Sequence, residues 1–157
     1  MIDVRELDVD DFVRASALPL HRFDGFTDRG TYLVAWDEDA PVGHVFVAWG
    51  GTELGLPELQ DMYVAPDRRD AGIGTALAEA AEALALRRGH DRCSLSTGTG
   101  NDSALRLYER LGYKAAGVEK RVTGRIEVRG GFIDVDETLV YLVKDLSISR
   151  PPVRRRA

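Results

Sequence analysis

A glycine-rich junction between a strand-like and a helix-like segment limits the folds open to this chain. Residues 68–75 read RRDAGIGT, after an apolar run and before an alanine- and leucine-rich helical pattern. Glycines lack a Cβ and let backbone amides approach a bound group closely, and the start of a helix attracts negative charge. The junction therefore predicts an anion-binding loop between a strand and the start of a helix.

Two other phosphate-binding patterns fail at this junction. The P-loop pattern requires Gly-Lys-Ser/Thr, which the segment lacks, and Leu77 stands where a dinucleotide fingerprint needs its third glycine. The remaining possibility is a loop whose N–H groups, at about residues 70–75, converge with the positive end of the helix dipole on a pyrophosphate.

Hydrophobic periodicity predicts seven strands and three helices, and their order indicates an α+β fold with a mixed sheet. The strands are expected at residues 2–6, 31–37, 42–49, 57–64, 92–97, 114–129 and 132–144, and the helices at 9–18, 72–88 and 101–111. Val9, Phe12, Val13 and Ala17 would form the inner face of the first helix. Turns are expected at residues 38–41 and at Gly130-Gly131.

The alternation of apolar residues changes phase within the predicted strand at residues 57–64. Leu59 falls on one face, whereas Met62 and Val64 fall on the other. A β-bulge produces such a switch and leaves backbone groups unpaired. We therefore expect a bulge with a free backbone amide in this strand.

Composition excludes several classes of protein. The single cysteine, Cys93, rules out an internal disulfide and a cysteine-based zinc site, and we expect no bound metal and a cytoplasmic protein. No stretch is apolar enough for a membrane span, and no targeting or anchoring segment is expected.

Charge divides the chain into an acidic body and a basic end. Four of the 21 basic residues lie in the last eight positions, which leaves 17 basic against 26 acidic residues elsewhere. This balance weakly favours a cationic substrate and argues against a nucleic-acid partner. We expect one domain over residues 1–146 and a basic, disordered tail over 147–157.

Two motifs together resemble the GNAT superfamily of acyl-CoA-dependent N-acyltransferases. One is Arg69-x-x-Gly72-x-Gly74 after the strand that ends at Val64; the other runs from Asn101 through Tyr108 to Gly112-Tyr113. The resemblance is dense between Glu58 and Tyr113 and elsewhere rests on element order. It implies a mostly antiparallel, twisted sheet whose fourth and fifth strands splay apart.

The resemblance also implies roles for individual residues. Acetyl-CoA, the expected acyl donor, would contact Met62, Tyr63, Val64, Arg69, Asp70, Ala71, Gly72, Ile73, Gly74, Thr75 and Asn101. Tyr108 would protonate the departing thiolate, although periodicity alone favours a core aromatic, and Asn101 would also suit a helix N-cap. Glu58 is the candidate general base, with Asp61 and His44 as substitutes. Many family members carry glycine where this chain has Asp70, which brings negative charge towards the pyrophosphate.

The expected activity is N-acetylation of a small primary amine by direct transfer in a ternary complex. Acetylation of protein N-termini or lysines, and a non-catalytic acyl-CoA sensor, remain open. The acceptor walls are expected at residues 18–30 and 120–137, where Asp24 and Asp28 would receive a cation and Phe23, Phe26 and Phe132 would supply apolar contacts. A homodimer is also possible.

Overall fold

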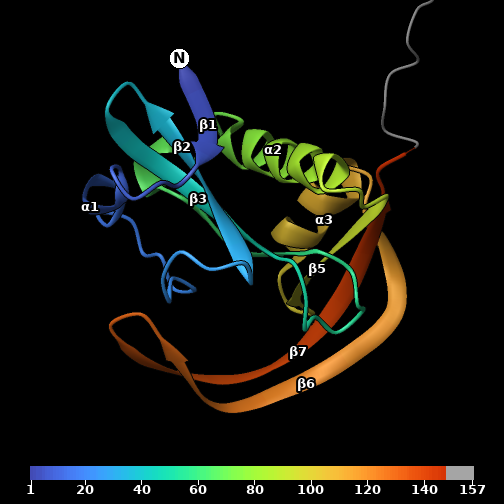
Figure 1. Ribbon diagram of the computed structural model, residues 1–157. Coiled ribbons are helices and arrows are strands. Elements are labelled where there is room, and N and C mark those ends of the chain that lie inside the picture. Colours follow the sequence, from blue (N-terminus) through green and yellow to red (C-terminus); the bar gives the residue numbers. More distant parts are fainter. Residues whose placement is uncertain (148–157) are drawn as a thin grey trace, which may run out of the picture.

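The computed structural model describes residues 1–147, whose strands form one seven-stranded sheet (Figure 1). The strands are β1 (Ile2–Glu6), β2 (Gly30–Asp37), β3 (Ala40–Ala48), β4 (Glu58–Val64), β5 (Arg92–Gly98), β6 (Lys114–Val128) and β7 (Gly131–Asp145). The helices are α1 (Phe12–Ala15), α2 (Ile73–Arg87) and α3 (Asp102–Arg110), and a 3₁₀ turn (Pro66–Arg68) precedes α2. Beyond Ser147, the predicted tail lies outside the described residues.

The strand order is β1-β2-β3-β4-β5-β7-β6, and β4 and β5 form its parallel pair. This pair is short, because only Glu58 and Leu59 find partners in β5, at Ser94 and Leu95. The other neighbouring strands run antiparallel. The prediction of a mostly antiparallel sheet with parting fourth and fifth strands is therefore confirmed.

Alternation along β2 sends its side chains into two hydrophobic cores. Leu33 and Ala35 pack with Leu77 and other residues of α2 on one face of the sheet. Tyr32 and Trp36 belong to a second cluster on the opposite face, together with residues near α1. Period-two alternation produces this division wherever both faces of a strand are covered.

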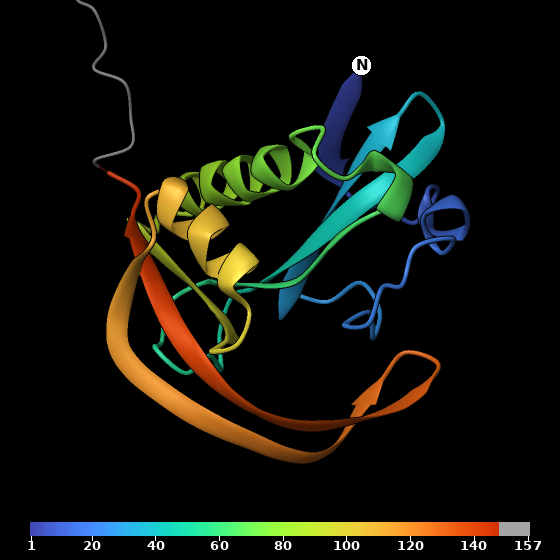
Figure 2. The same cartoon turned by 180° about the vertical axis from the view of Figure 1, so that it is seen from behind.

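The β6–β7 hairpin bends into an arch whose tip reaches the α1 side of the molecule (Figures 1 and 2). Arg129 closes the arch: its backbone N–H donates to His21 O at 3.3 Å, and an Nη atom lies 3.4 Å from Ser16 Oγ. The same guanidinium stands 5.3 Å from the centre of the Phe12 ring. Segments far apart in the sequence therefore enclose one space.

The first predicted helix is wrong in length and in face. Residues 9–11 form a turn, which is stabilised because the Asp8 carboxylate accepts the Asp11 N–H at 3.0 Å, and only Phe12–Ala15 are helical. Val9 and Val13 are exposed, whereas Ala15 is buried.

Within residues 1–147, no helix is long and apolar enough to span a membrane.

Both predicted hairpin turns differ from the structure by a small shift. Asp37 pairs with Ala40, so the first turn contains only residues 38 and 39. Val128 pairs with Gly131, which places the second turn at Arg129-Gly130 instead of Gly130-Gly131. The register of strand pairing sets these boundaries, and the turn residues alone do not determine that register.

Candidate active site

The bulge predicted in β4 is present. His44 pairs with Tyr63 and Phe46 with Gln60, so β4 carries one residue more than β3 across this interval. Asp61 has a φ of 50°, a left-handed conformation uncommon for a residue with a side chain. The extra residue interrupts the ladder at Asp61-Met62 and explains the phase switch between Leu59 and Met62.

The start of α2 presents backbone amides to the space beside β4. Gly72 precedes the helix with a φ of 79°, a conformation that glycine adopts without steric cost. Ala76 N–H bonds to Gly72 O at 3.0 Å, and helix geometry leaves the amides of the preceding first turn available to an outside acceptor. This end of α2 is therefore suited to bind an anion.

A cavity of about 670 Å³, the loop cavity, lies between β4, the start of α2 and α3. Ten of the eleven residues expected to contact the acyl donor line it: Met62, Tyr63, Val64, Arg69, Asp70, Gly72, Ile73, Gly74, Thr75 and Asn101. The eleventh, Ala71, is exposed to solvent. Ser103, Leu107 and Arg110 also line this cavity, and sequence reasoning missed them, although their helical spacing places them on one face of α3.

Charged residues of the loop differ in their partners. Arg68 forms an ion pair with Asp37, whereas Arg69 Nε donates to Val64 O at 3.3 Å. Asp70 is exposed, with a φ of 64°. The residues present fit a pyrophosphate through backbone amides and Arg69, with the Asp70 carboxylate opposing it.

A second cavity of about 600 Å³, the arch cavity, lies between the parted strands and the β6–β7 hairpin. Met62 and Asn101 line both cavities, so the two spaces meet where β4 and β5 separate. Glu58 lines the arch cavity with 6% of its surface exposed, and Ser96 Oγ donates to its Oε1 at 3.5 Å. Burial raises the pKa of the Glu58 carboxyl.

Tyr108 and Asn101 reach this junction from α3 and from the residue before it. Tyr108 lines the arch cavity and packs edge-on against Tyr113, with ring centres 6.1 Å apart. The Tyr108 phenol is protonated at neutral pH like an ordinary tyrosine, and burial raises its pKa further. Asn101 Oδ1 accepts the Ala104 N–H at 3.2 Å, so its side chain caps α3.

The two substitute bases have different surroundings inside the protein. Asp61 Oδ2 accepts Tyr32 Oη–H at 2.6 Å and His21 N–H at 3.0 Å. His44 is fully buried, and burial lowers the pKa of its imidazole, which favours the neutral form. Asp61 thus ties the bulge to the segment before β2, and His44 belongs to the interior of the sheet.

Both walls expected around the acceptor contribute to the arch cavity. Arg22 lines it from the first segment, and the hairpin supplies Lys120, Val122, Ile126, Ile133, Val135 and Glu137. Phe26 and Asp28 instead line a separate pocket, and Phe132 is 64% exposed near the hairpin tip. Sequence reasoning missed Tyr141, although alternation along β7 places it on the cavity face with Leu139.

A family model supports this interpretation of the geometry. Residues 1–113 match the model of the acetyltransferase (GNAT) family, and these residues contain the β4 bulge and the α2 loop. The chain belongs to the GNAT acetyltransferase family.

This GNAT chain is similar in sequence to part of a longer acetyltransferase. It is 32% identical over 96 residues to a mycothiol acetyltransferase of Clavibacter sepedonicus, an alignment that covers 61% of this chain and 31% of the relative. The chain thus spans less than a third of that relative.

Solved structures share the GNAT fold over nearly the whole chain. The ribosomal-protein-S18-alanine N-acetyltransferase from Escherichia coli has a TM-score of 0.69 at 18% identity, with all of both chains covered. A GNAT family acetyltransferase from Elizabethkingia anophelis with acetyl-CoA bound has a TM-score of 0.68 at 16% identity, over 92% of this chain and 97% of that one. GNAT neighbours therefore bind acetyl-CoA, in agreement with the expected donor.

Proposed function

We propose that this enzyme transfers an acetyl group from acetyl-CoA directly to a small primary amine in a ternary complex. The observation that carries the proposal is the meeting of two cavities at Met62 and Asn101. One is lined by the helix-start loop and the other by Glu58 and Tyr108. Two substrates bound in them would meet between the parted ends of β4 and β5.

The loop cavity would take the acyl donor. The amides at the start of α2 and the Arg69 side chain would bind the pyrophosphate, and Gly72 and Gly74 would let it approach the backbone. The pantetheine arm would then lie along Met62, Tyr63 and Val64 as an added strand. A backbone N–H freed by the bulge would polarise the thioester carbonyl.

The arch cavity would supply the proton transfers. Glu58 would accept a proton from the ammonium group, directly or through water, because an amine attacks only in its neutral form. The amine nitrogen then bonds to the acyl carbon as the carbon–sulfur bond breaks, and its surplus proton passes through water to the phenolate that Tyr108 becomes. Tyr108, which is protonated at neutral pH, would give its proton to the leaving thiolate.

Direct transfer fits the surroundings of the single thiol better than a cysteine intermediate does. Cys93 is fully buried in the core beside α2, and Tyr113 Oη lies 3.2 Å from its Sγ. Burial raises the pKa of the Cys93 thiol to about 11. A nucleophilic cysteine needs the opposite conditions of access and a lowered pKa.

The closed hairpin favours a small acceptor over a folded protein. Arg129 joins the tip of the arch to His21 and Ser16, so the acceptor would enter a bounded channel. A protein N-terminus or lysine in an extended segment could still enter, and protein acetylation remains the alternative. A non-catalytic acyl-CoA sensor is the second alternative, and homodimer formation and a single domain over residues 1–146 stay predictions.

Donor binding is tested by calorimetric titration of the full chain with acetyl-CoA. Gly72→Glu places a negative charge and a strained backbone at the loop and should abolish binding. Gly89→Glu is the matched control, because Gly89 also has a positive φ and free space but stands at the other end of α2. Equal binding by both variants would contradict the proposed donor site.

The acceptor class is tested by release of free thiol from acetyl-CoA with panels of small amines and of short peptides. Turnover with small amines supports the proposal, and a clear preference for peptides would replace it with protein acetylation. Donor binding without turnover on any amine would indicate the sensor.

A further inference from the structure

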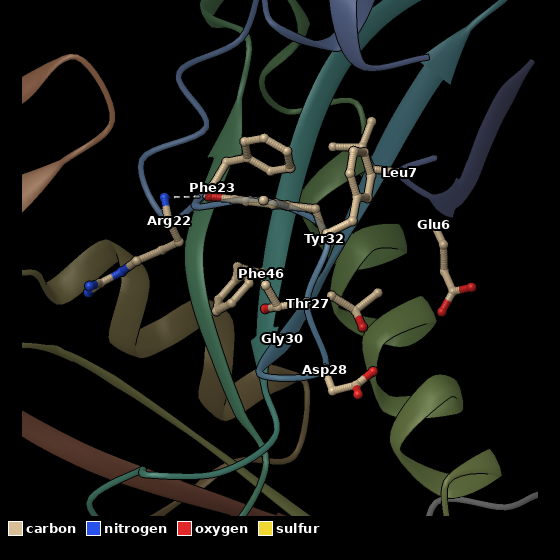
Figure 3. A pocket seen from close by; sticks show the side chains of 12 residues that line it. Glu6, Leu7, Arg22, Phe23, Thr27, Asp28, Gly30, Tyr32 and Phe46 are labelled. Carbon is tan, nitrogen blue, oxygen red and sulfur yellow. Dashed lines mark hydrogen bonds between the residues drawn. The ribbon is translucent and has the colours of Figure 1, made fainter. Parts of the chain in front are cut away.

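A third cavity on the same face of the sheet remains outside the acetyl-transfer site. It has a volume of about 300 Å³ and lies beneath the segment that connects α1 to β2 (Figure 3). We call it the aromatic pocket and define it by Glu6, Phe23, Phe26, Asp28, Tyr32 and Phe46, which all line it. Phe46 also lines the outer cavity of about 580 Å³ under the hairpin, which continues into the arch cavity.

The pocket is lined by four aromatic rings, each of which lies next to another in a continuous series. Phe23 and Phe26 meet edge to face with centres 5.3 Å apart, and Tyr32 and Phe46 lie 5.0 Å apart. Phe23 joins the two pairs at 6.5 Å from Tyr32. Phe26 is 53% exposed, an uncommon arrangement for a phenylalanine with neighbouring rings to pack against. Its free surface forms part of the wall of the pocket.

Phe46 lies between this pocket and the outer cavity, and its ring packs on a glycine of β2. A Cβ added to Gly30 would fall 1.9 Å from Cζ of the Phe46 ring. The ring therefore lies directly across the Gly30 backbone and forms a partition. A ligand in the aromatic pocket would contact this ring, which also lines the outer cavity.

Two carboxylates give the pocket its charge. Glu6 ends β1 and Asp28 lies just before β2, and neither has an ion-pair partner within residues 1–147. Arg22 also contributes to the lining, but its guanidinium extends away from both carboxylates, and its backbone N–H donates to Tyr32 Oη at 2.6 Å (Figure 3). The charge at this pocket is therefore negative.

Aromatic faces beside unpaired carboxylates match an organic cation. The negative face of an aromatic ring attracts an ammonium group, and the carboxylates add a longer-range attraction. We propose that the aromatic pocket is a second binding site, distinct from the acetyl-transfer site, for a small alkylammonium ion such as a quaternary ammonium. Binding there requires neither acetyl-CoA nor acetyl transfer, so the proposal stands apart from the proposed function.

The test is an NMR titration of the isotope-labelled full chain with choline, without acetyl-CoA. The comparison ligand is 3,3-dimethylbutan-1-ol, which has the same shape with carbon in place of the charged nitrogen. We expect saturable shifts of the amides at residues 6–7 and 23–32, and affinity for choline at least about fivefold higher than for the neutral alcohol.

The matched variants are Glu6→Gln combined with Asp28→Asn, and Asp24→Asn as the control. Asp24 is exposed on the same segment but lines the outer cavity. The double variant should weaken choline binding at least about fivefold, and the control less than about twofold. Because the three carboxylates are exposed, the fold should be unaffected.

Four results would overturn the proposal. They are shifts that do not saturate at tens of millimolar choline, equal affinity for the neutral alcohol, equal loss in the Asp24→Asn control, and shifts confined to the arch cavity around Glu58 and Ser96. The last result would assign the cation to the acceptor channel instead.

Discussion

The loop cavity and the arch cavity are built in different ways, although they share Met62 and Asn101. The loop cavity is formed by neighbouring residues of β4 and the start of α2, with one face of α3 opposite them, and it includes the backbone amides of a helix start. The arch cavity is formed by side chains from segments far apart in the sequence, which Arg129 brings together at the hairpin tip.

This difference explains how such a protein can keep one substrate and vary the other. Backbone amides at a helix start bind an anion whatever the neighbouring side chains are, provided that the turn retains its conformation. Side chains such as Arg22 and Lys120 can change without disturbing that turn. We therefore expect donor binding to tolerate substitutions that alter the choice of acceptor.

The largest expected effect separates chemistry from donor binding. Glu58→Gln should lower kcat/KM for the amine by about a hundredfold or more, because it removes the base, and leave acetyl-CoA affinity unchanged. Since burial raises the pKa of Glu58, the enzyme should lose rate as pH falls through a value above that of an ordinary carboxyl. Steady-state kinetics across pH measure both effects.

Glu53→Gln is the control for that variant, because Glu53 lines the same cavity but forms an ion pair with Lys120 at 3.0 Å. Glu58 is not the base if the two variants lower kcat/KM by the same factor. The same conclusion holds if the rate of Glu58→Gln falls at low pH in the same way as that of the unchanged protein.

The second prediction concerns the departing thiolate. Tyr108→Phe should lower kcat by about tenfold, which is about 1.4 kcal/mol of barrier, because the ring keeps its packing against Tyr113 but loses its proton. Calorimetry should give the same acetyl-CoA affinity as for the unchanged protein. An unaltered kcat at saturating amine would remove Tyr108 from the mechanism.

The third prediction isolates the backbone contribution of the loop. Gly72→Ala should lower the free energy of unfolding by about 1 kcal/mol, because a Cβ is disfavoured at a φ of 79° even where space is free. Gly74→Ala is the control, since its Cβ would meet Val64 at an ordinary 3.9 Å. Urea denaturation measures both variants, and equal stabilities would show that the turn carries no strain.

The smallest stability effect should arise at the tip of the arch. Arg129→Ala removes two contacts of an exposed side chain, to Ser16 and to the Phe12 ring, and should cost about 0.5 kcal/mol. It should nevertheless raise the relative rate with bulky amines severalfold, because the hairpin loses its attachment to Ser16 and Phe12. Arg125→Ala, which breaks only the exposed pair with Asp134, is the control for selectivity assays. Identical selectivity in the two variants would rule out a gating role for Arg129.

Local features of the sequence predicted the loop side well. The phase switch between Leu59 and Met62 indicates the bulge, and the glycines at 72 and 74 indicate the turn before α2, because these signals act within a few residues. The approach of Arg129 to His21 was not predictable in this way, since it depends on how far a long hairpin bends.

The prediction of the first helix was wrong for a related reason. Val9 and Val13 have helical spacing, but periodicity does not show whether another element covers the face they form, and here both are exposed. The Asp8 carboxylate instead stabilises a turn at the residues where the helix was expected to begin. Local hydrogen bonding by aspartate competes with helix formation in this manner.

The partition formed by Gly30 and Phe46 has a consequence for the evolutionary history of the chain. Because the tip of the ring fills the position of a Cβ, a side chain at residue 30 requires either a smaller residue at 46 or a displaced Phe46 ring. Either change opens the partition. Covariation between positions 30 and 46 among relatives would record which lineages have joined the two spaces into one.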